Sequence, residues 1–212
     1  MSIRAAAVLV ALSFAVPAVA QDRMPPIPAE RLTEAQKKAI QEFEAARKTG
    51  LSGPFWPLLR SPEVLSRARA MGDYLRFTSV LPPRLSEFVI IITARQWTQN
   101  YEWDVHAPLA EKGGLKPSII AAVAEGRRPD GMAEDEELLY TFCDELHRNR
   151  SISDATYARA IDLIGERGLV DVVGIVGYYG LVSMTLNIFE VSVPEGETPP
   201  FVMELPSYKV PA

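Results

Sequence analysis

Cysteine and histidine are scarce in this chain. Its 212 residues include one cysteine, Cys143, and two histidines, His106 and His147. A single cysteine excludes a disulfide within the chain, and it also excludes any mechanism that needs two neighbouring thiols. Cys143 stands at an apolar helical position in the stretch LLYTFCDEL. That position is typical of a buried, unreactive thiol.

Positive charge is not clustered anywhere along the sequence. The formal net charge is −5, and the short run GRR at 126–128 is too small to form a basic patch. Nucleic-acid binding depends on clustered lysine and arginine side chains, so no nucleic-acid partner is expected. With 48% hydrophobic and 23% charged residues, the composition is that of an ordinary globular protein.

The apolar run near the N-terminus is too short to cross a bilayer comfortably. It follows Arg4, spans 12 residues (AAAVLVALSFAV) and precedes the small residues Ala18 and Ala20. This order is typical of a secretory signal, whereas a spanning helix needs about 20 apolar residues. We therefore expect a signal peptide at 1–20, cleavage after Ala20, a secreted or periplasmic location and no membrane association afterwards. A retained membrane anchor is the alternative.

Strand-rich regions are absent, and the chain is expected to be all-α. Capping residues, apolar periodicity and terminal glycines or prolines divide it into about eight helical segments. The expected helices lie at 33–50, 61–77, 81–97, 99–113, 116–126, 133–149, 153–168 and 169–191.

The last expected helix is apolar on nearly all sides and contains Gly174, Gly177 and Gly180. Three glycines cost roughly 3 kcal/mol of helix propensity relative to alanine. Close packing against other helices in a bundle core would offset that cost. A transmembrane span is the alternative, which Asp171 and the tyrosines at 178–179 disfavour.

One short stretch, QNYEWDVH at 99–106, combines an acid and an imidazole on one helical face. Steps of three and four residues place Gln99, Glu102 and His106 in a row. Glu87 belongs to the preceding helix, which could fold back beside that row. Two carboxylates around an imidazole in an apolar pocket suit proton transfer, because burial shifts their pKa values and imidazole titrates near neutrality.

Two other interpretations of this group stay open. Glu102 and His106, one turn apart, could form only a local salt bridge worth roughly 0.2–0.5 kcal/mol. With Glu87 they could also bind a metal ion, but one histidine with carboxylates is a poor zinc set, and no metal is expected. His147 lies among charged residues at a helix end and is interpreted as structural.

The segment RLSEFVIIITARQWTQNYEWDVHAPLAEKGGL resembles the core of the carboxymuconolactone decarboxylase family. Flanking stretches extend the likeness over residues 53–191. The resemblance implies an all-α fold, assembly as a homo-trimer or homo-hexamer, and a pocket lined by the Glu102–His106 stripe. The rest of the mature chain then divides into an N-terminal extension with the first helix, at 21–52, and an extended proline-rich tail at 192–212.

The redox branch of that family, which partners alkyl hydroperoxide reductase, uses a glutamate, a C-x-x-C pair and a histidine. Glu87 and His106 match the glutamate and the histidine, whereas Gln99 and Glu102 occupy the cysteine positions. Neither side chain can form a thiolate or a disulfide, so peroxidase activity is the least favoured function. The decarboxylase branch carries a Tyr-Glu-Trp-type stretch that ends in the histidine, as YEWDVH does here.

The resemblance to the decarboxylase branch implies a lyase or isomerase that needs no cofactor. Its substrate would be a small carboxylated lactone or unsaturated acid, with Glu87, Glu102 and His106 as the catalytic residues. A non-catalytic, oligomeric protein that binds a small molecule is the alternative. The residues expected to contact the substrate are Gln99, Tyr101, Trp103 and Arg84, with Arg95 as a second candidate for binding an anionic group.

Overall fold

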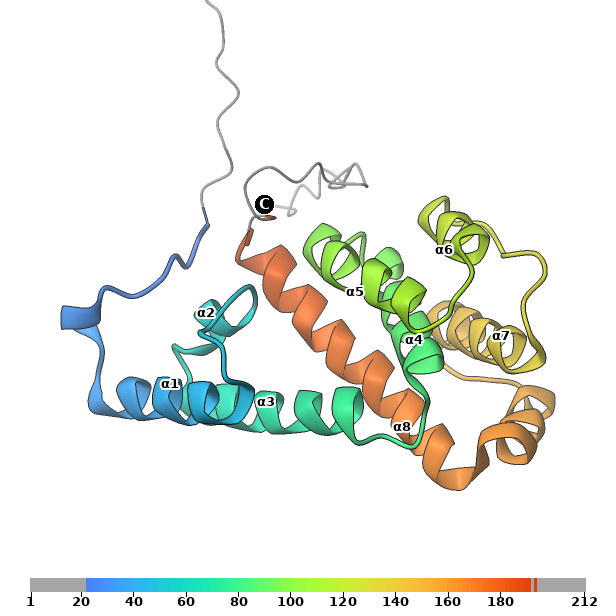
Figure 1. Ribbon diagram of the computed structural model, residues 1–212, viewed down its shortest axis with the longest axis horizontal. Helices are drawn as coiled ribbons and strands as arrows, with labels where there is room; N and C mark the ends of the chain where they lie inside the picture. Colours follow the sequence, from blue (N-terminus) through green and yellow to red (C-terminus); the bar gives the residue numbers. More distant parts are fainter. Residues whose placement is uncertain (1–21, 192, 194–212) are drawn as a thin grey trace, which may run out of the picture.

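Figure 1 shows the computed structural model, which describes residues 22–191 and 193. Every regular element in these residues is helical, which confirms the all-α class. The expected signal peptide and most of the C-terminal tail lie outside the described residues, so export stays a prediction from the sequence. The elements are η1 (Ala29–Arg31), α1 (Glu34–Arg47), α2 (Phe55–Leu58), α3 (Pro62–Phe77), α4 (Pro83–Gln96), α5 (Asn100–Lys112), α6 (Pro117–Ala124), α7 (Glu134–Asn149) and α8 (Asp154–Ile188).

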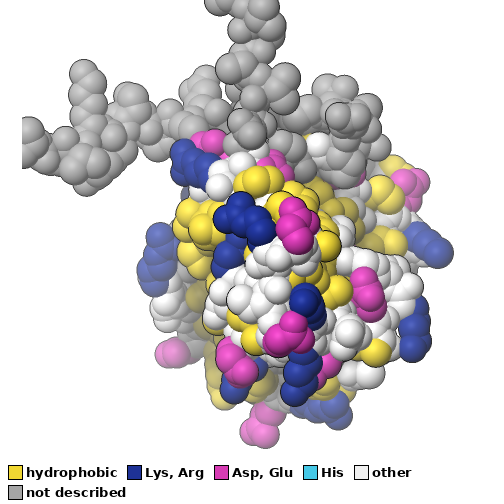
Figure 2. All heavy atoms as spheres, turned by 90° about the vertical axis from the view of Figure 1, so that its left-hand side faces the viewer, with side chains coloured by type: hydrophobic (Ala, Val, Ile, Leu, Met, Phe, Trp, Pro, Cys, Tyr) yellow, Lys and Arg dark blue, Asp and Glu magenta, His cyan; other side chains and the backbone are white. Residues whose placement is uncertain are grey.

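Helix α1 starts at the capping box that the sequence predicts. The backbone N–H of Gln36 donates to Thr33 Oγ1 (3.3 Å), and the N–H of Thr33 donates to Gln36 Oε1 (3.0 Å). The helix packs on α3, and Phe43 contacts Phe55 with ring centroids 4.8 Å apart. Figure 2 views the molecule from this side, where positive and negative side chains alternate without a continuous basic area. Because α1 packs on α3, the N-terminal extension is part of the helix bundle.

Helix α4 lies at the centre of the fold and contacts α5, α7, α8, α6 and α3. All of its residues from Leu85 to Ala94 are buried. Neighbours on every side explain why the run FVIII at 88–92 shows no polar face and still forms a helix. Each fully buried large apolar side chain contributes about 1.5–3 kcal/mol, so this helix contributes strongly to the stability of the core.

The last two expected helices form one element, α8, which bends at Gly165. Gly165 has φ 68° and ψ 173°, a backbone conformation that costs glycine little. The expected boundary at Gly168 is thus wrong by three residues. By length and composition α8 could cross a membrane, and no other described helix could. However, 56% of its apolar window is buried in the bundle, as in the core helix of a globular protein.

The expected role of the three α8 glycines is correct only in part. A Cβ on Gly174 would lie 3.0 Å from Leu75 Cδ2, so α3 and α8 approach closely there. At Gly180 the nearest such atom is Nε1 of Trp97, at 3.6 Å. Gly177, by contrast, is exposed, and no atom lies within 4 Å of its Cβ position. The expectation of core packing is wrong for Gly177, because this residue faces outward.

Gly72 provides a test of the contact between α3 and α8. A Cβ there would lie 2.4 Å from Oη and 2.5 Å from Cζ of Tyr178, a buried residue. We predict that Gly72→Ala lowers the free energy of unfolding by about 1–3 kcal/mol, measured by urea denaturation. Gly50→Ala is the control, since nothing lies within 4 Å of that Cβ position, and it should change stability by less than about 1 kcal/mol. Equal losses in both variants would contradict the interpretation.

Candidate functional site

Three buried ionisable side chains meet between α4 and α5. Nδ1 of His106 lies 2.6 Å from Oε2 of Glu87, and Nε2 of His106 lies 3.4 Å from Oε2 of Glu102. His106, Glu87 and Glu102 are 2%, 8% and 4% exposed. The structure thus brings Glu87 beside the Glu102–His106 row, as the helical spacing predicts.

The turn between α4 and α5 fixes this arrangement. Thr98 has a positive φ of 49°, and the N–H of Gln99 donates to the carbonyl of Ala94 (2.8 Å). The side-chain oxygen of Gln99 then accepts from the N–H of Tyr101 (2.6 Å) and caps α5. Its Nε2 donates to Oδ1 of Asn187 on α8 (2.7 Å). These bonds set where α5 begins, and therefore which of its residues face Glu87.

The surroundings of His106 favour its protonated form. Burial alone lowers the pKa of His106, but the hydrogen bonds to Glu102 and Glu87, together with their negative charge, outweigh burial and raise it above its usual value. A group whose folded pKa is raised stabilises the fold fully below its unfolded pKa of about 6.5, and this contribution is lost as pH rises through the folded pKa. The ring is also held edge-on against Tyr179, with centroids 4.9 Å apart.

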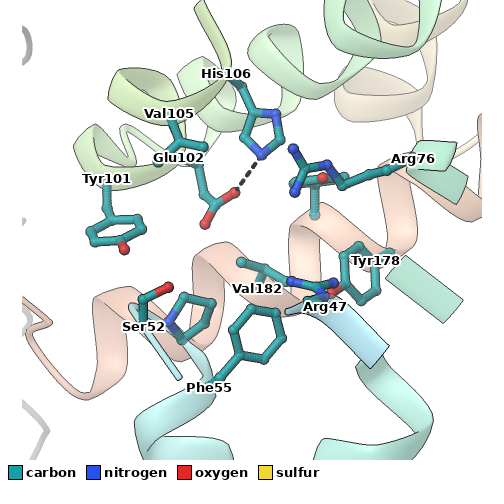
Figure 3. A pocket seen from close by; sticks show the side chains of 12 residues that line it. Arg47, Ser52, Phe55, Arg76, Tyr101, Glu102, Val105, His106, Tyr178 and Val182 are labelled. Carbon is teal, nitrogen blue, oxygen red and sulfur yellow. Dashed lines mark ion pairs between the residues drawn. The ribbon is translucent and has the colours of Figure 1, made fainter. Parts of the chain in front are cut away.

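A cavity of about 100 Å³ lies beside His106 and Glu102 (Figure 3). Glu87 is not part of its lining, because it lies behind the imidazole. The walls come from α1, the segment at 52–55, α3, α5 and α8, so the site depends on the whole bundle. The lining residues are Arg47, Ser52, Pro54, Phe55, Arg76, Tyr101, Glu102, Val105, His106, Tyr178, Tyr179 and Val182.

Two arginines from different helices, Arg47 and Arg76, add positive charge to the lining (Figure 3). Arg47 Nε donates to Asp73 Oδ1 (2.8 Å), and its guanidinium lies 4.6 Å from the ring centre of Phe55. Nothing in the sequence near these arginines marked them as site residues. They reach the cavity only because α1 packs on α3 and α3 in turn packs on α8.

Of the residues in and next to α5 that were expected to contact substrate, one lines the cavity and two do not. Tyr101 lines the cavity, close to Gly53, whose Cβ position lies 2.6 Å from Cζ of the tyrosine. Gln99 does not line it, because its side chain is used in capping α5 and in the bond to α8. Trp103 is buried in the core and does not line it either. The lining of this cavity therefore gives no support to substrate contact through Gln99 or Trp103, which stays a prediction from the sequence.

The two arginines predicted as anion anchors also lie elsewhere. Arg84 forms ion pairs with Asp135 (2.6 Å) and with Glu136 at the start of α7. Nε of Arg95 donates to the carbonyl of Ala124 (2.9 Å). Neither lines the cavity. Acceptors on α6 and α7, distant in sequence, engage both side chains, and their role as anion anchors stays a prediction from the sequence.

The described part of the chain contains neither an accessible thiol nor a cluster of side chains suited to a metal ion. Cys143 is fully buried, and burial raises its pKa to about 12. This confirms the interpretation of an inert core thiol. Over residues 22–191 and 193, no group of three or more His, Cys, Asp or Glu side chains is positioned to hold a metal ion.

Comparison with known proteins supports the fold. No family model matches the sequence, and no curated protein matches it. A crystal structure from Agrobacterium tumefaciens, of a protein of unknown function described as a candidate antioxidant defence protein AhpD, is similar. The two are 17% identical, with a TM-score of 0.53, over 65% of this chain and 94% of that one. The chain therefore has an AhpD-like fold, which is the fold of the carboxymuconolactone decarboxylase family.

The two histidines allow a direct test of these electrostatics. Burial and the nearby charge of Arg150 lower the pKa of His147, the opposite of the direction at His106. We predict that the two imidazoles, followed by NMR, titrate on opposite sides of pH 6.5, with His106 above. Glu87→Gln should lower the His106 midpoint and leave that of His147 unchanged. His147→Gln assigns the signals, and a His106 midpoint below 6.5 would show the assignment to be wrong.

Proposed function

We propose that this protein is a cofactor-free lyase or isomerase that moves a proton on a small carboxylated lactone or unsaturated acid. One observation carries the proposal: His106 lies at the cavity between two carboxylates that favour its protonated form. An imidazolium whose proton reaches a bound molecule is a general acid. Glu87 orients the ring from behind, as a carboxylate does behind many functional histidines.

The chemistry that such a group supports is simple. In decarboxylation of a β,γ-unsaturated acid, the bond to the carboxylate breaks and CO₂ leaves. The electron pair of that bond shifts the double bond along the chain, and the γ carbon takes the proton from His106. Glu102 then passes a proton from solvent back to the imidazole. In an isomerisation, the same groups remove a proton at one carbon and return it at another.

Peroxidase activity is not proposed for this chain. The similar A. tumefaciens protein is described as a candidate in antioxidant defence, but the likeness extends to the fold alone. By the family resemblance, Gln99 and Glu102 stand where the redox branch has its cysteines. Here one of them caps α5 and the other pairs with His106. The buried Cys143 cannot replace that pair.

The test is proton exchange at carbon. We predict that the protein catalyses deuterium uptake from D₂O into at least one member of a panel of small unsaturated acids and carboxylated lactones, including but-3-enoate, detected by NMR. His106→Gln and Glu102→Gln should each lower the rate at least about 100-fold, because general acid–base catalysis contributes roughly 10²–10⁴-fold. The rate should fall as pH rises through the raised pKa of His106.

His147→Gln is the matched control, since that histidine lies outside the cavity, and it should keep the wild-type rate. Ligand affinity, measured separately by calorimetry, should change by no more than a few-fold in Glu102→Gln. If ligands of the panel bind but no exchange occurs at any carbon, the protein is a binding protein and the proposal fails.

A further inference from the structure

Two polar groups in the cavity wall are buried without a hydrogen-bond partner in the described chain. They are Nε of Arg76 and Oη of Tyr179. A buried donor without an acceptor is unfavourable, and native proteins satisfy nearly all such groups. Both residues line the same cavity as His106 and Glu102. The two groups therefore point to an acceptor that a bound molecule would supply.

Arg76 differs from Arg47, the other arginine in this wall. Arg47 has a carboxylate partner, Asp73, which it shares with Arg69 (2.6 Å). Arg76 forms no ion pair within residues 22–191 and 193, and its guanidinium lies 5.1 Å from the ring centre of Phe77. Figure 3 shows its side chain directed into the cavity near His106. Of the two arginines in this wall, Arg76 is thus the one without a carboxylate partner in the described part of the chain.

Tyr179 supplies an uncharged donor next to it. The side chain is 2% exposed, and burial raises its pKa well above the usual value, so the phenol stays protonated. Its ring contacts the imidazole of His106 edge-on. A donor here lies close to the group that exchanges the proton.

The cavity adjoins a wider hollow of about 630 Å³, which shares Arg47, Ser52 and Arg76 with it. Arg76 therefore stands where the open hollow meets the small cavity. An anion that enters from the hollow meets this guanidinium before it reaches His106. A cation at the entrance to a cleft raises the local concentration of anionic ligands.

We propose that Arg76 and Tyr179 form an anion subsite that binds a carboxylate kept in the product, and that selects acids over their neutral analogues. In an isomerisation this is the acid group itself, and in a decarboxylation it is a second carboxylate, separate from the one that leaves as CO₂. A guanidinium can bind a carboxylate through two parallel hydrogen bonds, and the phenol adds a third donor. The inference rests on the proposed function and deepens it. The carbon chain of the acid would extend from this subsite toward Nε2 of His106.

Binding measurements test the subsite without requiring turnover. The probes are but-2-enoate and its uncharged analogue but-2-enamide, titrated at millimolar concentrations by NMR. We predict that the wild type binds the acid at least 10-fold more tightly than the amide. Arg76→Gln should lower affinity for the acid at least 10-fold and leave that for the amide unchanged. Arg76→Lys should restore part of the loss, and Tyr179→Phe should weaken binding of the acid 3- to 10-fold.

Arg67→Gln is the matched control. Arg67 lies on the same helix and is exposed, and its substitution by Gln changes the net charge by the same amount as Arg76→Gln. It should bind the acid as the wild type does. Equal affinity for acid and amide, absence of acid binding, or wild-type affinity in Arg76→Gln would each overturn the subsite. Arg76-dependent binding without proton exchange would instead overturn only the proposed function.

A separate observation concerns the outer face of α8. Residues spaced by three and four positions form an exposed apolar stripe on this helix. At 100° per residue, their positions around the helix axis span an arc of about 80°. The five large side chains are 38–69% exposed, and a row of this kind marks an interaction surface. The stripe consists of Val170, Val173, Gly177, Leu181, Met184 and Ile188.

The central part of the stripe is symmetric about Gly177. Val173 and Leu181 lie four residues away on either side, and Val170 and Met184 lie seven away. A two-fold axis at Gly177 would therefore pair Val173 with Leu181 of a second copy, and Val170 with its Met184. The open space above Gly177 lets two backbones approach. We infer that a second copy of this chain covers the stripe through an antiparallel α8–α8 contact centred on Gly177.

Cysteine cross-linking tests this register, because the native Cys143 is buried. We predict that Gly177→Cys forms a disulfide-linked dimer under mild oxidation. Val173→Cys should do so only together with Leu181→Cys. Val173→Glu should lower the mass of the wild-type assembly, measured by light scattering, by breaking this two-fold contact. Tyr157→Glu, at an exposed site before the bend, should not. A monomeric wild type, or no cross-link at position 177, would overturn the contact.

Discussion

Placing two carboxylates and an imidazole inside an apolar helix bundle costs on the order of several kcal/mol per ion in lost hydration. The 2.6 Å contact between His106 and Glu87 and the nearby Glu102 offset part of that cost by sharing a proton and opposite charges. Apolar residues of similar size would often give equal or greater stability at such positions. The presence of three ionisable groups in contact between α4 and α5 therefore gives little stability by itself, and it agrees with the proposed role in proton transfer.

This constraint shapes the rest of the site. A buried acidic group needs rigid surroundings, and the fully buried helix α4 carries Glu87 while the Gln99 cap sets the start of α5. Positive charge is contributed from a different source, since Arg76 belongs to α3. The cavity consequently has a part lined by Glu102 and His106 and a cationic part lined by Arg47 and Arg76. Such polarity orients a molecule that has an anionic end and a carbon to be protonated.

The sequence was sufficient for those features that depend on local spacing. Helix caps, the all-α class and the proximity of Glu87 to His106 all follow from neighbouring segments. The positive charge that Arg47 and Arg76 add to the cavity lining was not predictable. Both side chains reach the cavity only through packing between helices distant in sequence. For the same reason the ion pairs of Arg84 were not predictable, since its acidic partners begin α7, about 50 positions later. Gly177 also appeared internal, because periodicity alone cannot tell an outward stripe from a core face.

The position of Gln99 shows how one fold can support different chemistry. The sequence resembles a family whose redox branch has a cysteine at this position, and that cysteine must remain reactive. A carboxamide there instead accepts from the backbone of α5 and donates to Asn187 on α8, which ties the turn to the core. The turn thereby becomes a rigid support. A rigid support suits proton transfer, which requires fixed donor and acceptor positions, whereas a dithiol needs room for its sulfur atoms to exchange partners.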